Sequence, residues 1–545
     1  MPRARVAADQ TERSNGVAAR PPARATPTPA WVAWALPAIV LAITAAAFGR
    51  NLGTPLFGSD TWPWIASSQV HSPQDVVHLL FSPIMPGTQF EAQIAHFYHP
   101  LTALSYVLNV TLFGLNPLAY YATDLLLHLV AVGALYSLAR GLGLAPWASA
   151  ITALVFGLHP IAEATVPVIP RRQDLVVGAC FVSSMTLLVR ANLGSRQPRR
   201  GVIAGALVLY ALALGGKEIA YAGLPLVPFA LLCAPRTVPL GDRRLLRRTL
   251  AVCACFLAVE IVGFAIRWRV LGGLGGYFGS EANRGNLSGV LEFFLRPYVD
   301  AVLWPIHAVL PDRLRDWLTV VLVGLVVAVL AAARLRRQLL SIVLFGLVWQ
   351  ASFLALYIAA HNPLDAYLLY VPLAGFALVL GALLEGGWRW LVAIRTRGRV
   401  LTGQGAQNHV RDLALLVAAV AGACFVLATL WVSPLRAGYR EFPDAGYVSD
   451  RFLAAALPCL ASAQGTAQIE GLPNRIDYGT AESRFVDAFV FDNYSMESVL
   501  RLFAPGAPVT AQVNSLSDVH APPSAVRVSC DGDPQHRDLV VSYGP

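Results

Sequence analysis

The sequence predicts an all-α membrane protein that crosses the bilayer many times and carries a small α/β soluble domain at its C-terminal end. Hydrophobic residues make up 56% of the chain and charged residues only 13%, with a mean hydropathy of +0.56, which is far from the soluble balance. Apolar stretches recur, and arginines concentrate in the short loops between them. The net charge of +9 is therefore interpreted as a topology signal, and we expect no nucleic-acid partner.

The first elements are a tail, a span and a large loop. Residues 1–30 are rich in proline, alanine and arginine, which is typical of a disordered segment. The apolar stretch 31–49 has the length of a signal anchor, and the arginines before it place the tail in the cytoplasm. From Asn51 to Ala139 there is no lysine or arginine. Residues 50–117 are therefore predicted to form a loop on the outer face of the membrane.

Hydropathy and arginine placement together predict about eleven spans within a membrane module of residues 31–433. The predicted spans are 31–49, 118–139, 146–163, 175–190, 202–215, 219–233, 249–266, 316–333, 339–360, 366–385 and 413–433. Arginine-rich loops such as 196–200, 236–248 and 389–399 then fall on the inner side. Residues 100–115 and 298–311 are apolar but short, so we expect both to lie along the outer membrane surface. A re-entrant helix at 100–115 is the alternative.

Residues 434–545 form a separate soluble domain on the outer face, because hydrophobic density drops and acidic residues outnumber arginines there. Alternating runs such as 485–491 and 525–528 predict strands. Cys459 and Cys530 are the only cysteines of this domain. The outer face is an oxidising place in most cells, so we expect the two to form a disulfide. The other cysteines lie in apolar helices, where they act as small hydrophobes.

Ionisable residues gather at the predicted outer boundary, where their cost usually indicates function. They are Asp60, Glu91, His96, His99, Glu163, Arg171, Arg172, Asp174, Lys217, Glu218, Arg267, Arg269, Arg296, His361 and Asp365. Arginines on the outer side oppose the positive-inside rule, which suggests that a negative partner holds them there. A phosphate-bearing ligand is the natural candidate, since guanidinium binds phosphate through two donors.

Several of these residues have a structural alternative. Asp60 directly follows the first span and is the first outer acid, but it could simply cap a helix that begins near Trp62. His99 precedes Pro100 and could mark a helix start. Arg172 and its neighbours could form an ordinary interfacial ion cluster, and Lys217 and Glu218 a plain salt bridge. These alternatives stay open at the level of sequence.

An ordered set of short motifs resembles one membrane family. The motifs are residues 99–106 (His-Pro-Leu-Thr-Ala-Leu-Ser-Tyr), 113–117 (Phe-Gly-Leu-Asn-Pro), 125–129 (Leu-Leu-Leu-His-Leu), 158–164 (Leu-His-Pro-Ile-Ala-Glu-Ala), 172–175 (Arg-Gln-Asp-Leu), 217–218 (Lys-Glu) and 367–376 (Tyr-Leu-Leu-Tyr-Val-Pro-Leu-Ala-Gly-Phe). Together they resemble bacterial relatives of the transmembrane and tetratricopeptide-repeat O-mannosyltransferases, within the C superfamily (GT-C) of glycosyltransferases. The resemblance covers about residues 50–385, and residues 434–545 stand where many relatives carry repeats.

The resemblance implies a GT-C-like fold and a hexosyl- or mannosyl-type transferase that uses a sugar on a polyprenyl phosphate. It also implies a plasma (inner) membrane location with an outer active site, and Asp60 as the acid of the first loop that acts in catalysis. Relatives usually have Arg at the position of His99, Arg-Lys-Asp at 172–174 and Glu-Arg-Tyr at 365–367. These departures bear on how the donor binds. The acceptor, whether protein, lipid or glycan, is not implied.

The residues fit that chemistry independently. Glycosyl transfer from a phosphate needs a base for the acceptor hydroxyl, which Asp60 would supply, and positive charge for the departing phosphate. Arg172, Lys217 and Arg296 are the predicted phosphate ligands. A divalent metal (Mg²⁺ or Mn²⁺) held by Asp60 or Glu91 with a histidine stays open. The competing class is a transporter or flippase of a lipid-linked or anionic solute, which should place charges at mid-membrane.

Overall fold

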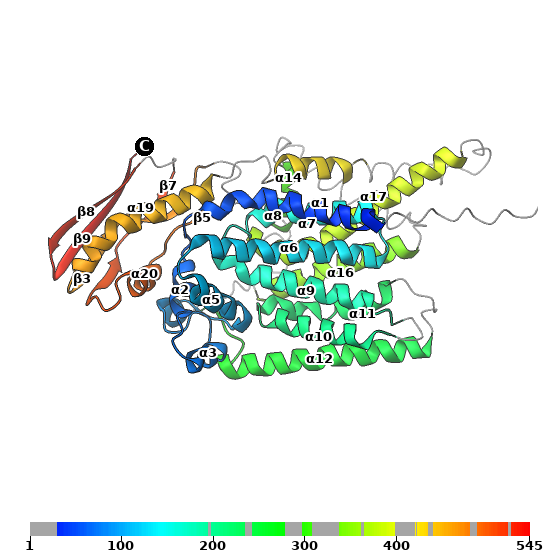
Figure 1. The fold of residues 1–545 in the computed structure, drawn as a ribbon, viewed down its shortest axis with the longest axis horizontal. Helices are drawn as coiled ribbons and strands as arrows, with labels where there is room; N and C mark the ends of the chain where they lie inside the picture. Colours follow the sequence, from blue (N-terminus) through cyan, green and yellow to red (C-terminus); the bar gives the residue numbers. More distant parts are fainter. Residues whose placement is uncertain are drawn as a thin grey trace, which may run out of the picture.

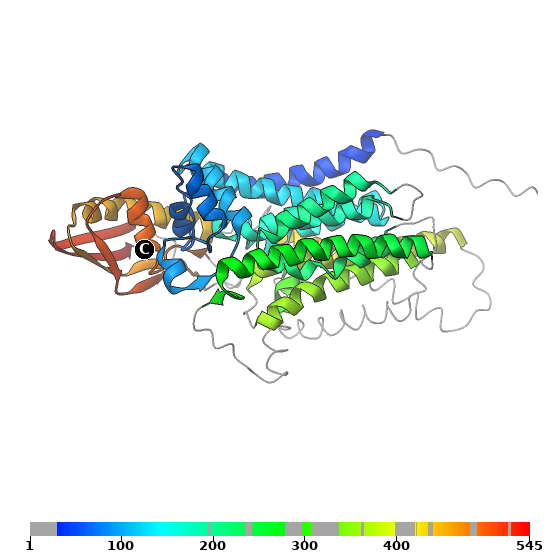
Figure 2. The same cartoon turned by 90° about the horizontal axis from the view of Figure 1, so that it is seen from below.

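The computed structural model describes residues 30–193, 198–234, 242–277, 297–307, 337–360, 365–397, 420, 422–433, 440–479, 488–520 and 525–544. Figures 1 and 2 show a long bundle of helices with an α/β domain at one end. The chain is mostly helical and its C-terminal region is a small α/β unit. The predicted fold class is confirmed in this outline.

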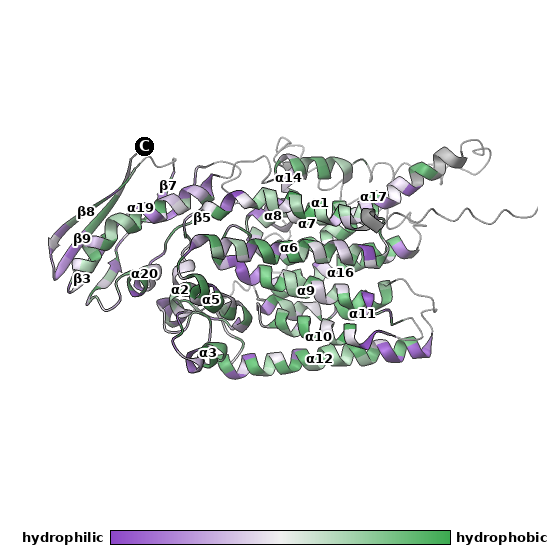
Figure 3. Ribbon diagram, in the orientation of Figure 1, coloured by the Kyte–Doolittle hydropathy of each residue, from purple (hydrophilic) through white to green (hydrophobic). Residues whose placement is uncertain are grey.

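The bundle consists of apolar helices of different lengths. They are α1 (Ala30–Gly49), α6 (Pro117–Leu142), α7 (Pro146–Leu158), α9 (Arg172–Arg190), α10 (Arg200–Leu214), α11 (Leu226–Cys233), α12 (Arg243–Leu271), α16 (Arg337–Ala360) and α17 (Tyr370–Arg397). Helix α9 lies at the centre, packed against α6, α10 and α17. Figure 3 shows that hydrophobic residues dominate the length of these helices. Side chains that point away from the core remain apolar on α12, as expected for a surface that faces lipid.

Among the described residues, six helices are long and apolar enough to cross a membrane: Trp34–Gly53, Pro117–Leu142, Ile169–Arg190, Arg243–Leu271, Gln338–Ala359 and Ala366–Arg389. The predicted count of about eleven is not confirmed. Predicted spans 146–163 and 202–215 are the short helices α7 and α10, and 219–233 is divided into the 3-10 helix η3 (Glu218–Gly223) and α11. Span 316–333 lies outside the described residues, and 413–433 is described only in part. Hydropathy registers apolar content, but it does not locate the breaks that proline introduces at Pro160 and Pro225.

The segment between α1 and α6 folds into short elements at one end of the bundle. These are η1 (Arg50–Gly53), α2 (Thr61–Ser67), α3 (Pro73–Leu80), α4 (Gln89–Gln93), β1 (Ala95–His96) and α5 (Pro100–Phe113). Strand β1 pairs with β2 (Gly276–Tyr277), which follows α12. Helix α5 occupies the predicted surface segment 100–115 and leaves Leu108, Leu112 and Phe113 exposed. Residues 297–307 are helical too, ending in α14 (Trp304–His307), whereas 308–311 lie outside the described residues.

The opposite end of the bundle holds residues from the arginine-rich segments. Arg248 donates to the Leu193 carbonyl at 3.1 Å, and Gln338 donates to the Leu142 carbonyl at 3.0 Å. Glu385 accepts from the Ala145 amide at 2.7 Å. The ends of α6 and α9 therefore meet the beginnings of α16 and α12 there, and α17 meets the start of α7. The predicted inner arginines and the predicted outer loop thus lie at opposite ends of the bundle.

The C-terminal domain begins with α19 (Glu441–Ser462). Its main sheet has the order β6-β3-β9-β8, formed by β6 (Thr510–Val513), β3 (Thr466–Glu470), β9 (His536–Gly544) and β8 (Ala525–Asp533). Strand β3 is parallel to both neighbours, and β8 and β9 form an antiparallel hairpin. A smaller sheet contains β5 (Ala488–Phe489), β4 (Leu472–Ile476) and β7 (Leu516–Val519), and α20 (Ser495–Phe503) follows β5. The strand prediction at 525–528 is confirmed, and that at 485–491 is confirmed over 488–489.

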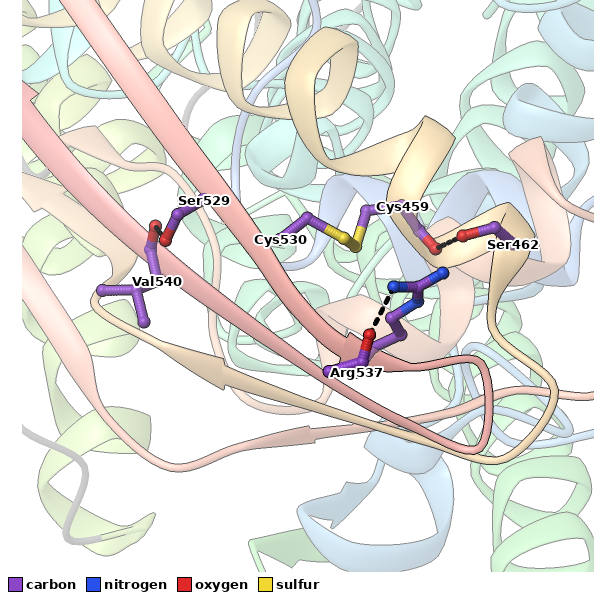
Figure 4. Close-up of a disulfide and its surroundings, with 7 residues drawn as sticks. Cys459, Ser462, Ser529, Cys530, Arg537 and Val540 are labelled. Atoms are coloured by element: carbon purple, nitrogen blue, oxygen red, sulfur yellow. Dashed lines mark hydrogen bonds between the residues drawn. A yellow bond between two sulfur atoms is a disulfide. The ribbon is translucent and has the colours of Figure 1, made fainter.

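Cys459 of α19 and Cys530 of β8 are joined by a disulfide, as predicted, with their Cα atoms 6.2 Å apart (Figure 4). The bond ties the only long helix of the domain's described residues to the strand at one edge of its main sheet. It closes a loop with a sequence separation of 71 residues.

Replacing both cysteines by alanine should destabilise the C-terminal domain, because the unfolded chain regains loop entropy worth about 4 kcal/mol in the chain-entropy model. Thermal unfolding of purified protein would measure the loss, and mass mapping of non-reduced peptides should find the linked pair. Two freely alkylated thiols in the native protein would contradict the bond.

Candidate functional site

The loop that presents Asp60 is a tight turn before α2. Gly58 has a φ of +108°, and a Cβ there would lie 2.8 Å from Oγ1 of Thr61, so glycine fits both the backbone and the space. The Thr61 amide donates to the Gly58 carbonyl at 3.0 Å. Asp60 occupies the N-cap position of α2, but its side chain makes no capping hydrogen bond. The capping alternative is therefore wrong, and the carboxylate is directed elsewhere.

The carboxylate of Asp60 faces the C-terminal domain. Tyr494 at the start of α20 donates a short hydrogen bond from its hydroxyl to Oδ1 of Asp60. Burial raises the pKa of the half-buried Asp60 carboxyl above its ordinary value, and the Tyr494 bond partly lowers it again. The charge of Asp492 also raises this pKa, whereas the charge of Arg171 lowers it. A carboxylate whose pKa is raised holds a proton more strongly than an ordinary one, which suits a role in proton transfer.

Arg172 is fully buried and bonded on every side. Its guanidinium donates to Asp124 at 2.5 Å, to Asn109 at 2.5 Å and to the Tyr120 carbonyl at 3.1 Å. It also lies over the Tyr106 ring, 4.3 Å from the centroid. The bonds join α5, α6 and α9. Because these groups enclose the guanidinium, it has no surface to offer a phosphate in this arrangement, contrary to the predicted donor role.

A stack of aromatic rings connects Arg172 to the loop of Asp60. Tyr106 stacks on Trp64 of α2, with centroids 4.9 Å apart and planes inclined by 15°. Trp64 is 1% exposed and Tyr106 is fully buried. The hydroxyl of Tyr106 donates to the Ile169 carbonyl at 2.6 Å. The position of α2 is therefore fixed by the ion pair beneath it.

Two further cations lie close to one aromatic ring. The guanidinium of Arg171 is 4.2 Å from the centroid of the Tyr367 ring, and Nζ of Lys217 is 5.4 Å from it. Both contacts are within cation–π range. Lys217 also donates to both carboxylate oxygens of Asp174, at 2.9 and 3.0 Å. The alternative of a plain salt bridge between Lys217 and Glu218 is therefore wrong, because Lys217 pairs with Asp174.

Glu218 pairs instead with His99, whose Nε2 lies 2.6 Å from Oε2 of the carboxylate. Burial alone would raise the pKa of Glu218, but His99, Lys217 and Arg267 hold it below its ordinary value. Arg267, near the end of α12, is 7% exposed and donates through Nη2 to the Leu274 carbonyl at 2.8 Å. Its Nη1 is buried with no hydrogen-bond partner among the described residues. A buried, unpaired guanidinium nitrogen indicates a missing acceptor.

An apolar cavity of about 490 Å³ lies beside this cluster. It is lined by Tyr98, Pro100, Ala211, Leu214, Gly215, Tyr221, Ala258, Val259, Val262, Gly263 and Ile266. Pro100 follows His99, Gly215 lies two residues before Lys217, and Ile266 precedes Arg267. The apolar cavity between α10 and α12 is thus lined by near neighbours of the charged residues, a combination that suits an amphiphilic ligand.

The other predicted residues have separate surroundings. Oε2 of Glu91 accepts from the Gly87 amide at 2.7 Å, and His96 lies in β1. Glu163 is buried and pairs with Arg50 at 3.2 Å, and burial raises its pKa to about 7 against the opposing charge of Arg50. Asp365 is exposed at the start of η4 (Ala366–Leu369). Arg296 and His361 lie outside the described residues.

Within the described parts of the chain, no three His, Cys, Asp or Glu side chains come close enough to hold a metal ion. Oδ1 of Asp60 is taken by Tyr494, and Oε2 of Glu91 is taken by a local amide. We derive no step through a metal.

The sequence analysis named the charged residues of this cluster, but it chose other residues as phosphate ligands and missed Tyr494. Arg171 and Arg267 stood among the outer ionisable residues and were not selected as phosphate ligands. Their position opposite to the positive-inside rule was the available signal. Tyr494 gave no signal, because the sequence does not place the C-terminal domain against the first loop.

The fold and the site define a multi-pass membrane protein whose α/β domain lies over a charged end of its bundle. Its sequence relatives are transmembrane O-mannosyltransferases, as the resemblance predicts. Protein O-mannosyl-transferase TMTC1 of Mus musculus is 27% identical over 143 residues, which span 26% of this chain and 15% of the relative. TMTC3 of Mus musculus is 25% identical over 172 residues (31% and 18%), and Tmtc2 of Drosophila melanogaster is 31% identical over 131 residues (23% and 14%). The matches thus span less than a fifth of these curated relatives. No family model matches the chain.

Two solved structures can be aligned with most of the chain. ArnT from Cupriavidus metallidurans, bound to undecaprenyl phosphate, is 14% identical, with 88% of this chain and 86% of that chain covered and a TM-score of 0.42. The Archaeoglobus fulgidus oligosaccharyltransferase is 13% identical, with 90% and 64% covered and a TM-score of 0.46.

Replacing Arg172 by methionine should destabilise the whole bundle by about 3–5 kcal/mol, because it leaves the buried Asp124 unpaired. Arg475→Met is the matched control, since Arg475 pairs with Asp477 at 2.9 Å on the surface and should cost about 1 kcal/mol or less. Thermal unfolding in detergent would compare them. If Arg172→Met unfolds like the control but loses donor binding, the residue is a phosphate ligand after all.

Proposed function

We propose that the chain is an integral membrane glycosyltransferase that moves a sugar from a polyprenyl-phosphate donor to an acceptor hydroxyl. The observation that carries the proposal is the arrangement at one end of the bundle. A half-buried carboxylate, Asp60, lies on a path of cations that leads through Arg171 and Lys217 to an apolar cavity. The sequence relationship to O-mannosyl-transferases supports the same reaction class.

The donor binds with its phosphate at the head of the cavity. Nη1 of Arg267 provides the unused donor, and Lys217 adds positive charge nearby. The isoprenoid tail lies along the apolar walls of α10 and α12. Arg296, which belongs to the stretch after β2, is proposed as a further phosphate ligand. Arg172 is proposed to hold the helices together rather than to touch the donor.

The reaction places the sugar between the phosphate and Asp60. The acceptor oxygen attacks the anomeric carbon while Asp60 takes the acceptor's hydroxyl proton. The bond from that carbon to the phosphate oxygen breaks, and its electron pair leaves on the phosphate. Arg171, Lys217 and Arg267 stabilise the charge that develops there. The product is a glycosylated acceptor and a polyprenyl phosphate.

Three ion pairs, each with at least one buried partner, support this geometry. His99 with Glu218, Asp174 with Lys217, and Arg50 with Glu163 fix the segments that carry the cations. Glu91 and His96 are proposed to stabilise the first loop, through the bond of Glu91 with the Gly87 amide and through strand β1. His361 and Asp365 precede Tyr367 in the sequence and are proposed as further supporting residues. Mannose is the proposed sugar, from the names of the sequence relatives. A protein, lipid or glycan hydroxyl is the acceptor.

The reaction takes place outside the cytoplasm, at the plasma (inner) membrane. The positive-inside rule supports a cytoplasmic N-terminus, and the disulfide of the C-terminal domain suits an oxidising compartment. The bilayer and the lipid-linked donor are the partners.

A transporter or flippase of a lipid-linked solute is the alternative. One observation favours it: Glu260 lies within α12 and accepts from the Tyr210 hydroxyl at 2.6 Å, and acids inside spans often mark transport paths. If vesicles that contain the protein move a lipid-linked donor from one leaflet to the other and form no glycosylated product, the result would support transport instead.

Asp60→Asn should abolish sugar transfer while donor binding and folding are retained. Removing a general base costs roughly 10²–10⁴-fold in rate. Asp75→Asn is the matched control, because Asp75 is an acid of the same loop that caps α3 together with Ser72. Transfer from a polyprenyl-phosphate sugar by each purified variant is the measurement. Near wild-type turnover in Asp60→Asn would move the search to Glu163 and Asp174.

Reporter fusions test the orientation. Fusions at Gly201, Gly241 and Gly398 should read cytoplasmic, and fusions at Ser82 and Ser462 should read external, because arginine placement puts the two ends of the bundle on opposite sides. A cytoplasmic reading at Ser462 would overturn this topology.

A further inference from the structure

The C-terminal domain contacts the first loop at the proposed catalytic carboxylate itself. The hydroxyl of Tyr494 donates to Oδ1 of Asp60, and the hydroxyl of Ser495 donates to the Ser59 carbonyl at 2.9 Å. Helix α20, which these residues begin, packs against α2, and the two are neighbours in Figure 1. The proposed active site is thus built from two parts of the chain more than four hundred residues apart.

Packing around this contact holds the domain in place. Trp62 of α2 is 1% exposed and stacks on Phe491, with centroids 5.9 Å apart, while Phe503 meets it edge-on at 5.9 Å. Polar contacts flank the rings. Glu497 accepts from the backbone N–H of Gln89 at 3.0 Å, and Arg501 donates to the Gly87 carbonyl at 2.8 Å. A large buried aromatic residue with polar contacts at its rim is typical of a specific interface.

We propose that Tyr494 is a positioning residue for Asp60, so that the C-terminal domain completes the active site instead of standing apart from it. The inference rests on the proposed function, since it assigns Asp60 the role of base. It also gives the C-terminal domain a direct part in the reaction.

The geometry assigns Tyr494 to orientation and not to proton transfer. Its hydroxyl occupies Oδ1, which leaves Oδ2 as the oxygen that takes the proton of the acceptor. Its ring is held edge-on against Phe90 of α4, with centroids 5.4 Å apart. Burial is the main influence that raises the pKa of the Tyr494 hydroxyl. The hydroxyl therefore stays protonated and acts as a donor that fixes the carboxylate rotamer.

The charged and titratable groups around Asp60 determine the sign of a pH test. They are Tyr494 and Asp492 of the C-terminal domain, Arg171 next to α9, and Tyr106 of α5. The Tyr494 hydrogen bond stabilises the ionised carboxylate, so its removal raises the pKa of Asp60. A base must be ionised to act. The acid limb of the rate profile should therefore move to higher pH when the hydroxyl is lost.

Tyr494→Phe removes the hydroxyl and keeps the ring. Tyr478→Phe is the matched control, because Tyr478 donates to Asp444 at 2.5 Å within the same domain and does not contact Asp60. For Tyr494→Phe we expect kcat to fall roughly 10–100-fold, the size of one hydrogen bond to a charged group, with donor KM unchanged and the acid limb shifted upward. Tyr478→Phe should leave the profile unmoved. The same profile in Tyr494→Phe and wild type would overturn the inference, as would equal shifts in both variants.

A second readout separates this inference from the proposed function. Carbodiimide with glycine ethyl ester labels accessible carboxyl groups, and mass mapping follows the Asp60 peptide across pH. The midpoint of Asp60 labelling should rise in Tyr494→Phe and stay constant in Tyr478→Phe. If wild type transfers no sugar, the proposed function fails, and the labelling alone decides whether Tyr494 holds Asp60. An unchanged midpoint in an active enzyme would reject Tyr494 and leave the glycosyltransferase intact.

Discussion

The buried ion pair of Arg172 and Asp124 is the interaction on which the functional end of the molecule depends. Two charges that are shielded from solvent are stable only when their remaining donors and acceptors are also hydrogen-bonded. Here the arrangement uses Asn109 and the Tyr120 carbonyl, so that α5, α6 and α9 must meet at one point. Without the charge of Arg172 or of Asp124, the contacts that hold these three helices together would be lost.

A series of contacts connects this ion pair to the residues of the proposed active site. Tyr106 covers the guanidinium, Trp64 stacks on Tyr106, and α2 then brings Asp60 to the C-terminal domain. A second series of contacts runs from Arg171 through Tyr367 to Lys217 and the apolar cavity. In the proposed reaction, the first series fixes the base and the second provides charge for the phosphate. Rigid support of this kind is what a transfer reaction in a water-poor site requires.

The sequence was sufficient for the class, the separation of charge between the two ends and the disulfide, because hydropathy, arginine placement and cysteine position are local properties. It was not sufficient for pairings. His99 pairs with Glu218 and Lys217 with Asp174, and such choices are made by tertiary packing. Arg172 was expected to bind phosphate because it is an outer arginine, but burial gives it Asp124 instead. The contact of Tyr494 with Asp60 joins segments whose distance in the sequence conceals it.

A structure of the protein with a non-transferable polyprenyl-phosphate-sugar analogue tests the central claim most directly. The account predicts that the phosphate lies beside Arg267 and Lys217, that the isoprenoid tail fills the cavity between α10 and α12, and that the anomeric carbon faces Asp60. Phosphate bound at the opposite end of the bundle, near Arg248, would contradict it, as would a sugar remote from Asp60.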